Sequence, residues 1–141
     1  MTSNSTPAPE FDIPVTVNDA YTGNVTPLLN EIRHALTALL EQDQRTVIDL
    51  RAMPLAPGEE TRIEEELGQG EVRVELSALG KSDIVETRYP GVWLITHSNT
   101  EGKVIGKYIE IALIPDILQA QQGDIEVGLE QLSQKLTTST E

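Results

Sequence analysis

The sequence contains no cysteine and only two histidines, His34 and His97. The absence of cysteine excludes disulfides, thiol catalysis and cysteine-ligated zinc or iron–sulfur sites, and it leaves the redox compartment undetermined. A metal site made from other residues would need three or four converging ligands. Because the two histidines lie far apart in the chain, carboxylates would have to supply the rest. The sequence therefore predicts neither a metal nor another cofactor.

Basic residues are also scarce, with ten Lys and Arg against 23 Asp and Glu and a formal net charge of −13. Phosphate backbones and anionic membrane surfaces repel such a chain, which argues against nucleic acid and membrane partners. The charge is typical of a surface that keeps a protein soluble, and the alternative is that it steers a basic partner segment toward the protein. The chain has no apolar stretch near the roughly 20 residues of a membrane span and no signal peptide, which predicts a cytoplasmic protein.

The 141 residues are predicted to form one domain over residues 21–136, between a flexible N-terminal tail over 1–20 and a short C-terminal tail over 137–141. The first helix is predicted over 26–42, with Thr26 as its cap and Pro27 in its first position. Apolar residues recur in this helix at steps of three and four, which predicts one buried stripe. The stripe consists of Leu29, Ile32, Leu36, Leu39 and Leu40.

A short strand over 46–50 and a proline-containing interruption precede a short helix that begins near Pro57. The acidic residues of that helix are predicted to form a solvated face near its positive N-terminal end. The alternatives are a cluster that imitates metal ligands or a surface that binds a basic peptide. The residues are Glu59, Glu60, Glu64, Glu65 and Glu66.

Residues 71–114 are typical of strands joined by short turns. Apolar and polar residues alternate over 71–76, a turn follows at 80–82, and strands are predicted over 84–89, 92–97 and 103–114 with a hairpin at 99–102. A final helix is predicted over 124–136, with Ile125, Leu129, Leu132 and Leu136 facing inward. The fold class is therefore α+β, a mainly antiparallel β-meander with helices packed on one face.

No catalytic constellation is evident, and the sequence predicts a protein that is not an enzyme. The serines lack a nucleophile elbow, and the Gly68-Gln69-Gly70 segment follows a helix, the reverse of the order in a dinucleotide site. His34 is predicted to pack at the boundary of the first helix and His97 to form a hydrogen bond at a strand end. Trp93 is predicted to be a core anchor, and the alternative is a contact residue for a partner.

Several short motifs, in this order, resemble the conserved region of the hydrogenase expression/formation proteins HupH, HyaF and HoxQ. They are Thr46-Val-Ile-Asp-Leu-Arg, Met53-Pro-Leu, Leu67-Gly-Gln-Gly-Glu-Val, Gly91-Val-Trp with His97, Glu110-Ile and Ile114-Pro-Asp-Ile-Leu, and together they span about residues 25–136. The resemblance implies a non-catalytic chaperone or scaffold of nickel–iron hydrogenase maturation. It also implies a hydrogenase subunit, the small iron–sulfur-carrying one, or another maturation protein as the partner.

The resemblance supplies no catalytic residues, so we expect only shape and contact roles. Gly68, Gly70, Gly91 and Trp93 are expected to determine local shape, and Trp93 and His97 are candidates for contact with a partner. Two other functions stay open: a small metal- or ligand-handling protein that uses Glu and His, and a structural homodimeric module.

Many members of the family that the motifs resemble carry two copies of the region, whereas this chain carries one. The resemblance therefore implies either that this chain self-associates to restore the pair or that it has taken another role. An isologous homodimer through an exposed edge of the strand over 103–114 would keep the acidic faces apart. The alternative is that this strand is central in the sheet and that the protein is a monomer.

Overall fold

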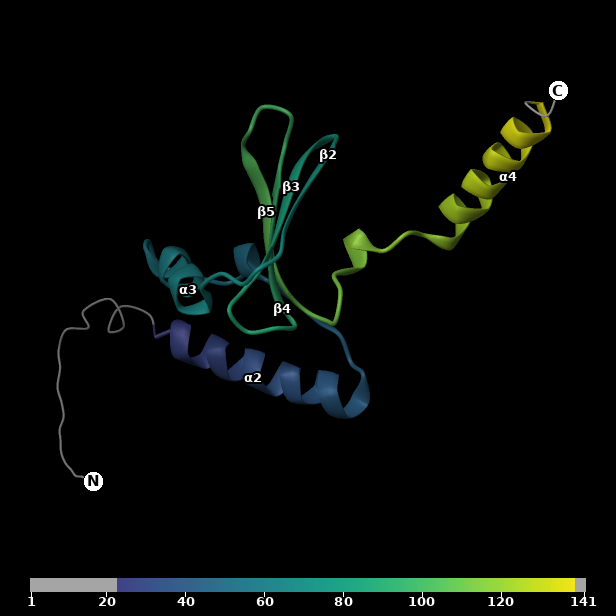
Figure 1. Ribbon diagram of the computed structural model, residues 1–141. Coiled ribbons are helices and arrows are strands. Elements are labelled where there is room, and N and C mark those ends of the chain that lie inside the picture. The colour runs from purple at the N-terminus through teal and green to yellow at the C-terminus, as the bar shows by residue number, and fades with distance from the viewer. Residues whose placement is uncertain (1–22, 139–141) are drawn as a thin grey trace, which may run out of the picture.

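A five-stranded antiparallel sheet organises residues 23–138, the part of the chain that the computed structural model describes (Figure 1). In chain order the elements are α2 (Val25–Gln42), β1 (Thr46–Asp49), η1 (Leu50–Ala52), α3 (Glu59–Leu67), β2 (Arg73–Ala78), β3 (Gly80–Glu86), β4 (Val92–Ser98), β5 (Val104–Ile111), η2 (Asp116–Leu118) and α4 (Gln122–Thr138). The strand order is β1-β5-β4-β3-β2. The predicted α+β class and the meander from β2 to β5 are confirmed.

The predicted tails fall largely outside this description. Residues 1–20 are not among the described ones, and of residues 137–141 only Thr137 and Thr138 are, as the last two residues of α4.

The strand that carries the single tryptophan, β4, lies at the centre of the sheet. Its neighbour β5 pairs with β4 on one side and with β1 on the other. Because both sides of β5 are already hydrogen-bonded, the prediction that it offers a free edge to a second copy is wrong. The edges of the sheet are β1 and β2.

Two hairpins set the register of the meander. The β4–β5 hairpin occurs where it was predicted, and the Asn99 side-chain oxygen accepts hydrogen bonds from the amides of Glu101 (2.9 Å) and Lys103 (3.0 Å). The β2–β3 turn lies at residue 79, before the predicted 80–82, because Gly80 adopts a φ of +117° and already pairs with Ala78. Both β2 and β3 are therefore displaced from their predicted bounds.

The helices α2 and α3 cover one face of the sheet and form the larger core (Figure 1). Alternation along the central strands places Val92, Ile109 and Ile111 on this face, and all three are fully buried. The helices contribute Val25, Leu28, Ile32, Ala35, Leu39, Ile63 and Leu67. This core fixes the position of both helices on the sheet.

Helix α2 differs from its prediction in its start and in its buried stripe. It begins at Val25, and Asn24 occupies the cap position without a capping side-chain bond. Leu40 is 85% exposed and His34 is also exposed, so both predictions of packing are wrong. The stripe is centred on Leu28, Ile32, Ala35 and Leu39, and the rotation of about 100° per residue turns positions 34 and 40 toward solvent.

The acidic helix α3 is solvated only in part. Glu59 is 4% exposed, and its carboxylate accepts hydrogen bonds from the amides of Asn24 (3.2 Å) and Ala56 (3.1 Å) and from the Asn24 side chain (3.3 Å). It thereby joins the start of α2 to the start of α3. Of the predicted solvated face, only Glu65 and Glu66 are exposed.

The opposite face of the sheet carries a smaller core. Ile84, Trp93 and Ile95 are buried there, and Val74, Leu76, Tyr108 and Leu118 pack against them. Leu118 comes from η2, so the segment after β5 folds back over this face.

Helix α4 forms as predicted but is not packed inward. It projects from the rest of the protein (Figure 1), and none of its described residues is buried. Ile125, Leu129, Leu132 and Leu136 are 56%, 64%, 55% and 59% exposed, so the prediction that they face the core is wrong. Periodicity identified the apolar side of the helix but not what lies against it.

Candidate functional site

The glycines of the α3–β2 connection lie where other backbone comes close. The Gly70 amide donates to the Glu86 carbonyl at 2.7 Å, and a Cβ at Gly70 would lie only 2.6 Å from the Thr87 carbonyl oxygen. Gly68 ends α3 and lies against the side chain of Arg88. The backbone amide of Arg88 donates a hydrogen bond to the Leu67 carbonyl. A side chain at position 70 would push β2 away from the end of β3.

Gly91 shapes the β3–β4 connection beneath α2. Its φ is +92°, and a Cβ there would lie 3.4 Å from the Leu36 side chain. Its carbonyl accepts from the Ala112 amide at 2.9 Å, which ties the connection to the end of β5. The backbone conformation and the closeness of α2 together favour glycine at this position.

An apolar hollow of about 270 Å³ lies beside this connection, between α2, the end of α3 and the loop after β3. Its lining consists of Leu29, Ile32, Arg33, Leu36, Leu67 and Tyr89. Tyr89 is 44% exposed at the rim of the hollow, and Arg33 is the one charged residue of the lining among residues 23–138. A hollow with this lining suits an apolar side chain of a partner.

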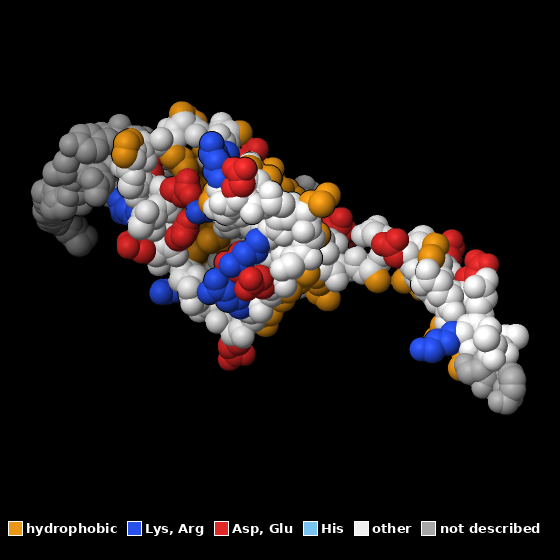
Figure 2. Space-filling model, turned by 90° about the horizontal axis from the view of Figure 1, so that it is seen from above, with side chains coloured by type: hydrophobic (Ala, Val, Ile, Leu, Met, Phe, Trp, Pro, Cys, Tyr) orange, Lys and Arg blue, Asp and Glu red, His pale blue; other side chains and the backbone are white. Residues whose placement is uncertain are grey.

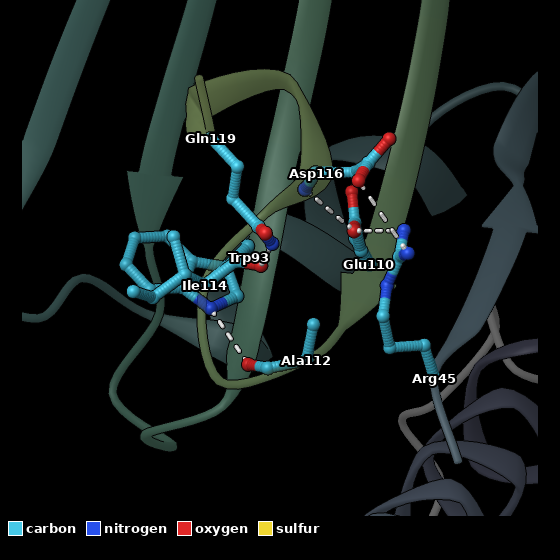
Figure 3. A network of polar contacts seen from close by, with 7 residues as sticks. All are labelled: Arg45, Trp93, Glu110, Ala112, Ile114, Asp116 and Gln119. Carbon is cyan, nitrogen blue, oxygen red and sulfur yellow. Dashed lines mark hydrogen bonds and ion pairs between the residues drawn. The ribbon is translucent and has the colours of Figure 1, made fainter. Parts of the chain in front are cut away.

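Trp93 lies on the opposite side of the sheet and is 7% exposed. Its indole N–H donates to the Ala112 carbonyl at 3.1 Å, and Figure 3 shows the ring beside Ile114 and Gln119. The ring thus holds the segment after β5 in place. Trp93 is therefore placed as a core anchor, as the sequence predicted. Because the ring is buried, little of its surface is accessible to a partner.

A second anchor of the same segment is Glu110, which is 5% exposed. Its carboxylate accepts from the Arg45 guanidinium at 2.8 Å and from the Asp116 amide at 3.1 Å (Figure 3). Arg45 lies before β1 and Asp116 begins η2, so one buried carboxylate joins three parts of the chain. Burial of an ionised group requires such pairing.

His97 is half-buried near the end of β4, and its Nδ1 is 2.7 Å from the Ser82 hydroxyl. Its ring also contacts the edge of Tyr108, with ring centres 5.8 Å apart. The predicted strand-end hydrogen bond is therefore present. His97, Ser82 and Tyr108 lie on the same sheet face as Trp93.

Lys107 projects from the helix-covered face of β5 toward α3. Its ammonium lies 2.6 Å from carboxylate oxygens of both Glu60 and Glu64. Burial by itself would lower the pKa of Lys107, but the hydrogen bonds and the charges of the two glutamates outweigh it, and the pKa is raised above 10.5. The triad attaches α3 to the sheet.

The five residues singled out from the sequence do not form one site. Gly91 lies beside the apolar hollow, Gly68 and Gly70 lie at the α3–β2 connection, and Trp93 and His97 lie on the opposite sheet face. The hollow itself was missed, because its lining comes from three separate elements. One feature of the sequence pointed toward the hollow. Leu29 and Leu36 belong to the apolar stripe predicted for α2, but in the structure they are only partly buried and lie beside the buried stripe.

Within residues 23–138, no group of three or more His, Asp or Glu side chains is arranged to hold a metal ion. In the same described part of the chain, no helix combines the length and the apolar character needed to cross a membrane. The described residues do carry two apolar surfaces, the hollow and the exposed stripe of α4.

Comparisons with known proteins agree with the motifs. Residues 22–139 match the family model described as HupH hydrogenase expression protein, C-terminal conserved region. The chain is 31% identical over 111 residues to the hydrogenase expression/formation protein HupQ of Azotobacter chroococcum mcd 1, and 30% identical over 114 residues to HoxQ of Azotobacter vinelandii. Each match covers 77% of this chain and 39% of the relative, so the chain spans about two fifths of the length of these curated relatives.

A solved structure is similar over nearly its whole length. The hydrogenase expression protein HupH from Thiobacillus denitrificans ATCC 25259 superposes with a TM-score of 0.78 at 39% sequence identity. The match covers 83% of this chain and 98% of that one.

Proposed function

Because the chain belongs to the HupH hydrogenase expression protein family, through its C-terminal conserved region, we propose that it is a non-catalytic accessory protein of nickel–iron hydrogenase maturation. In this proposal it acts as a chaperone or scaffold and binds the hydrogenase small subunit before assembly. The match of residues 22–139 to the family carries the proposal.

The apolar hollow is the binding surface that we propose. Leu29 and Leu36 lie on the outer side of α2, next to the core stripe, and Tyr89 forms the opposite rim. The surrounding helices are fixed by buried residues, so the hollow is formed before a client arrives. An apolar side chain exposed on an unassembled subunit would fit such a surface, since its burial removes apolar area from water.

The net charge of −13 supports a secondary electrostatic contribution. A client with a basic segment would associate faster at low salt, because opposite charges attract over a Debye length of about 10 Å at 0.1 M ionic strength. The apolar contact would set the dissociation rate, so salt is expected to change association more than dissociation.

The test is a binding measurement between the immobilised full chain and a nickel–iron hydrogenase small subunit from the same organism. We expect binding by the natural chain, and a loss of at least about tenfold in affinity for Tyr89→Ala and for Leu29→Gln, which truncate or polarise the hollow. Tyr89 uses only its backbone in the hydrogen bonds with Thr87, so alanine preserves them.

The matched control is Leu40→Gln, the same change on the same helix at a position that is 85% exposed outside the hollow. It should bind like the natural chain. Absence of binding by the natural chain would overturn the proposed client, and equal losses in Leu29→Gln and Leu40→Gln would overturn the proposed surface.

A further inference from the structure

Helix α4 presents an apolar stripe that nothing in its own chain covers among the described residues. The stripe consists of Ile125, Leu129, Leu132 and Leu136, each more than half exposed. Figure 2 shows the helix as an arm that extends from the rest of the molecule, with hydrophobic side chains along it. A stripe of this length on a protruding helix is typical of an interaction surface.

Among the described residues, α4 makes no packing contact with the body of the same chain, since none of its residues is buried. Helices α2 and α3 cover one face of the sheet, and Leu118 from η2 packs against the smaller core of the other face. The segment that leads to α4 is held at its start by the Trp93–Ala112 and Glu110–Asp116 hydrogen bonds. From this anchored segment α4 extends away from the body (Figure 1).

We propose that α4 is a homodimerisation helix, which pairs antiparallel with α4 of a second copy about a two-fold axis. The apolar stripe of one copy is thus covered by the same stripe of the second copy. The proposal does not depend on the hydrogenase client, and it differs from a sheet-edge dimer because β5 has no free edge.

The spacing of the stripe is self-complementary. The steps from Ile125 to Leu129, Leu132 and Leu136 are four, three and four residues, and they read the same in both directions. An antiparallel pair centred between residues 130 and 131 therefore places Ile125 against Leu136 of the second copy, and Leu129 against Leu132. Steps of four and three are also those of coiled-coil contact positions.

The charges of α4 favour the antiparallel direction. Asp124, Glu126 and Glu130 lie in its first half, whereas its second half carries Lys135 and no acidic residue among those described. Antiparallel pairing places each acidic half beside the half that carries the lysine. Parallel pairing would place the two acidic halves side by side, which is unfavourable.

Gly128 lies beside the stripe near the proposed axis, and a Cβ at this position would meet nothing within 4 Å. Glycine in a helix interior is unfavourable by itself, and here the absent side chain leaves room for a second helix to approach closely. The contact is short, because a helix of 17 residues is only about 25 Å long. We therefore expect a dimer that dissociates on dilution.

The first experiment measures the mass of the full chain by light scattering from 1 to 200 µM. We expect a rise from 15.5 kDa toward twice that value. The double variant Leu129→Glu/Leu132→Glu should remain at 15.5 kDa throughout, with an unchanged near-ultraviolet signal of Trp93 because α4 contributes no buried residue to the body. The matched control Leu79→Glu changes a leucine that is 95% exposed at the β2–β3 turn and should dimerise normally.

The second experiment uses the absence of natural cysteines to determine the direction of pairing. The double variant Ile125→Cys/Leu136→Cys should form a covalent dimer under mild oxidation, because the two positions meet across the axis. Ile125→Cys alone should not, since the two copies of residue 125 would be about 16 Å apart along the helices, beyond disulfide reach.

A mass of 15.5 kDa for the natural chain at 200 µM overturns the dimer. Unchanged dimerisation of Leu129→Glu/Leu132→Glu overturns the use of α4. Efficient crosslinking of Ile125→Cys alone overturns the antiparallel arrangement.

Discussion

Helices α2 and α4 have nearly the same length, 18 and 17 residues, and each carries an apolar stripe, yet only one is buried. Helix α2 lies on the sheet and contributes five buried residues, whereas α4 contributes none. The difference is that residues of β4, β5 and α3 form a matching apolar surface for α2. An amphipathic pattern therefore indicates that a helix needs an apolar partner surface. It does not indicate where that surface lies.

The largest contrast is expected between equivalent leucine substitutions in these two helices. Leu28 is 1% exposed, so Leu28→Ala leaves a cavity and should lower the free energy of unfolding by about 3 kcal/mol. Leu136→Ala should change it by less than about 0.5 kcal/mol. Urea unfolding at low micromolar concentration, followed by Trp93 fluorescence, gives both values. Comparable losses would show that α4 packs on the body.

A smaller effect is expected for the carboxylate that joins α2 to α3. Glu59→Ala leaves the donors of Asn24 and Ala56 without their buried acceptor and should lower the free energy of unfolding by about 2 kcal/mol. Glu66→Ala, at an exposed position of the same helix, should change it by less than about 0.5 kcal/mol. Equal results in thermal unfolding of the two variants would mean that the Glu59 contacts contribute nothing to stability.

Replacement of Lys107 tests the attachment of α3 to the sheet. Lys107→Met keeps most of the apolar stem but removes the ion pairs with Glu60 and Glu64, and should cost about 1 kcal/mol. The control Lys81→Met removes a pair whose side chains are each more than half exposed and should cost less than about 0.5 kcal/mol.

The pH dependence of the Lys107 contribution has a defined sign. Because the folded pKa lies above the ordinary 10.5, the contribution is fully present below pH 10.5 and is lost as the pH rises through the folded pKa. The natural chain should therefore lose more stability than Lys107→Met between pH 9 and 12. Parallel curves for the two proteins would contradict the raised pKa.

The smallest effect is expected from removal of the arm. A stop after Ala120 deletes α4, which contributes no buried residue, and should change the free energy of unfolding by less than about 0.5 kcal/mol at low micromolar concentration. Chemical denaturation of the shortened chain checks this value. A loss of several kcal/mol would show that α4 is part of the folded body.

The fold was predictable where the pattern is local. The alternation in β2, the Asn99 hairpin and the strand around Trp93 each reflect the immediate surroundings of a few residues, and together they predicted the α+β class and the meander. The start of α2 was predicted wrongly because the Asn24 side chain bonds to Glu59 and Pro54, which are distant in the chain. The apolar hollow was not predictable for the same reason, since its lining comes from three elements.

The sequence by itself determined the class of the fold, the identity of the amphipathic helices and the family, because these follow from local periodicity and from motifs in order. Only the tertiary structure decided which apolar stripe is buried, which glutamates are solvated and whether β5 is an edge. Glu59 and Glu65 are the same residue type on one short helix, yet one is buried in hydrogen bonds and the other is exposed. Burial depends on which surfaces meet, and that is set by contacts between residues far apart in the chain.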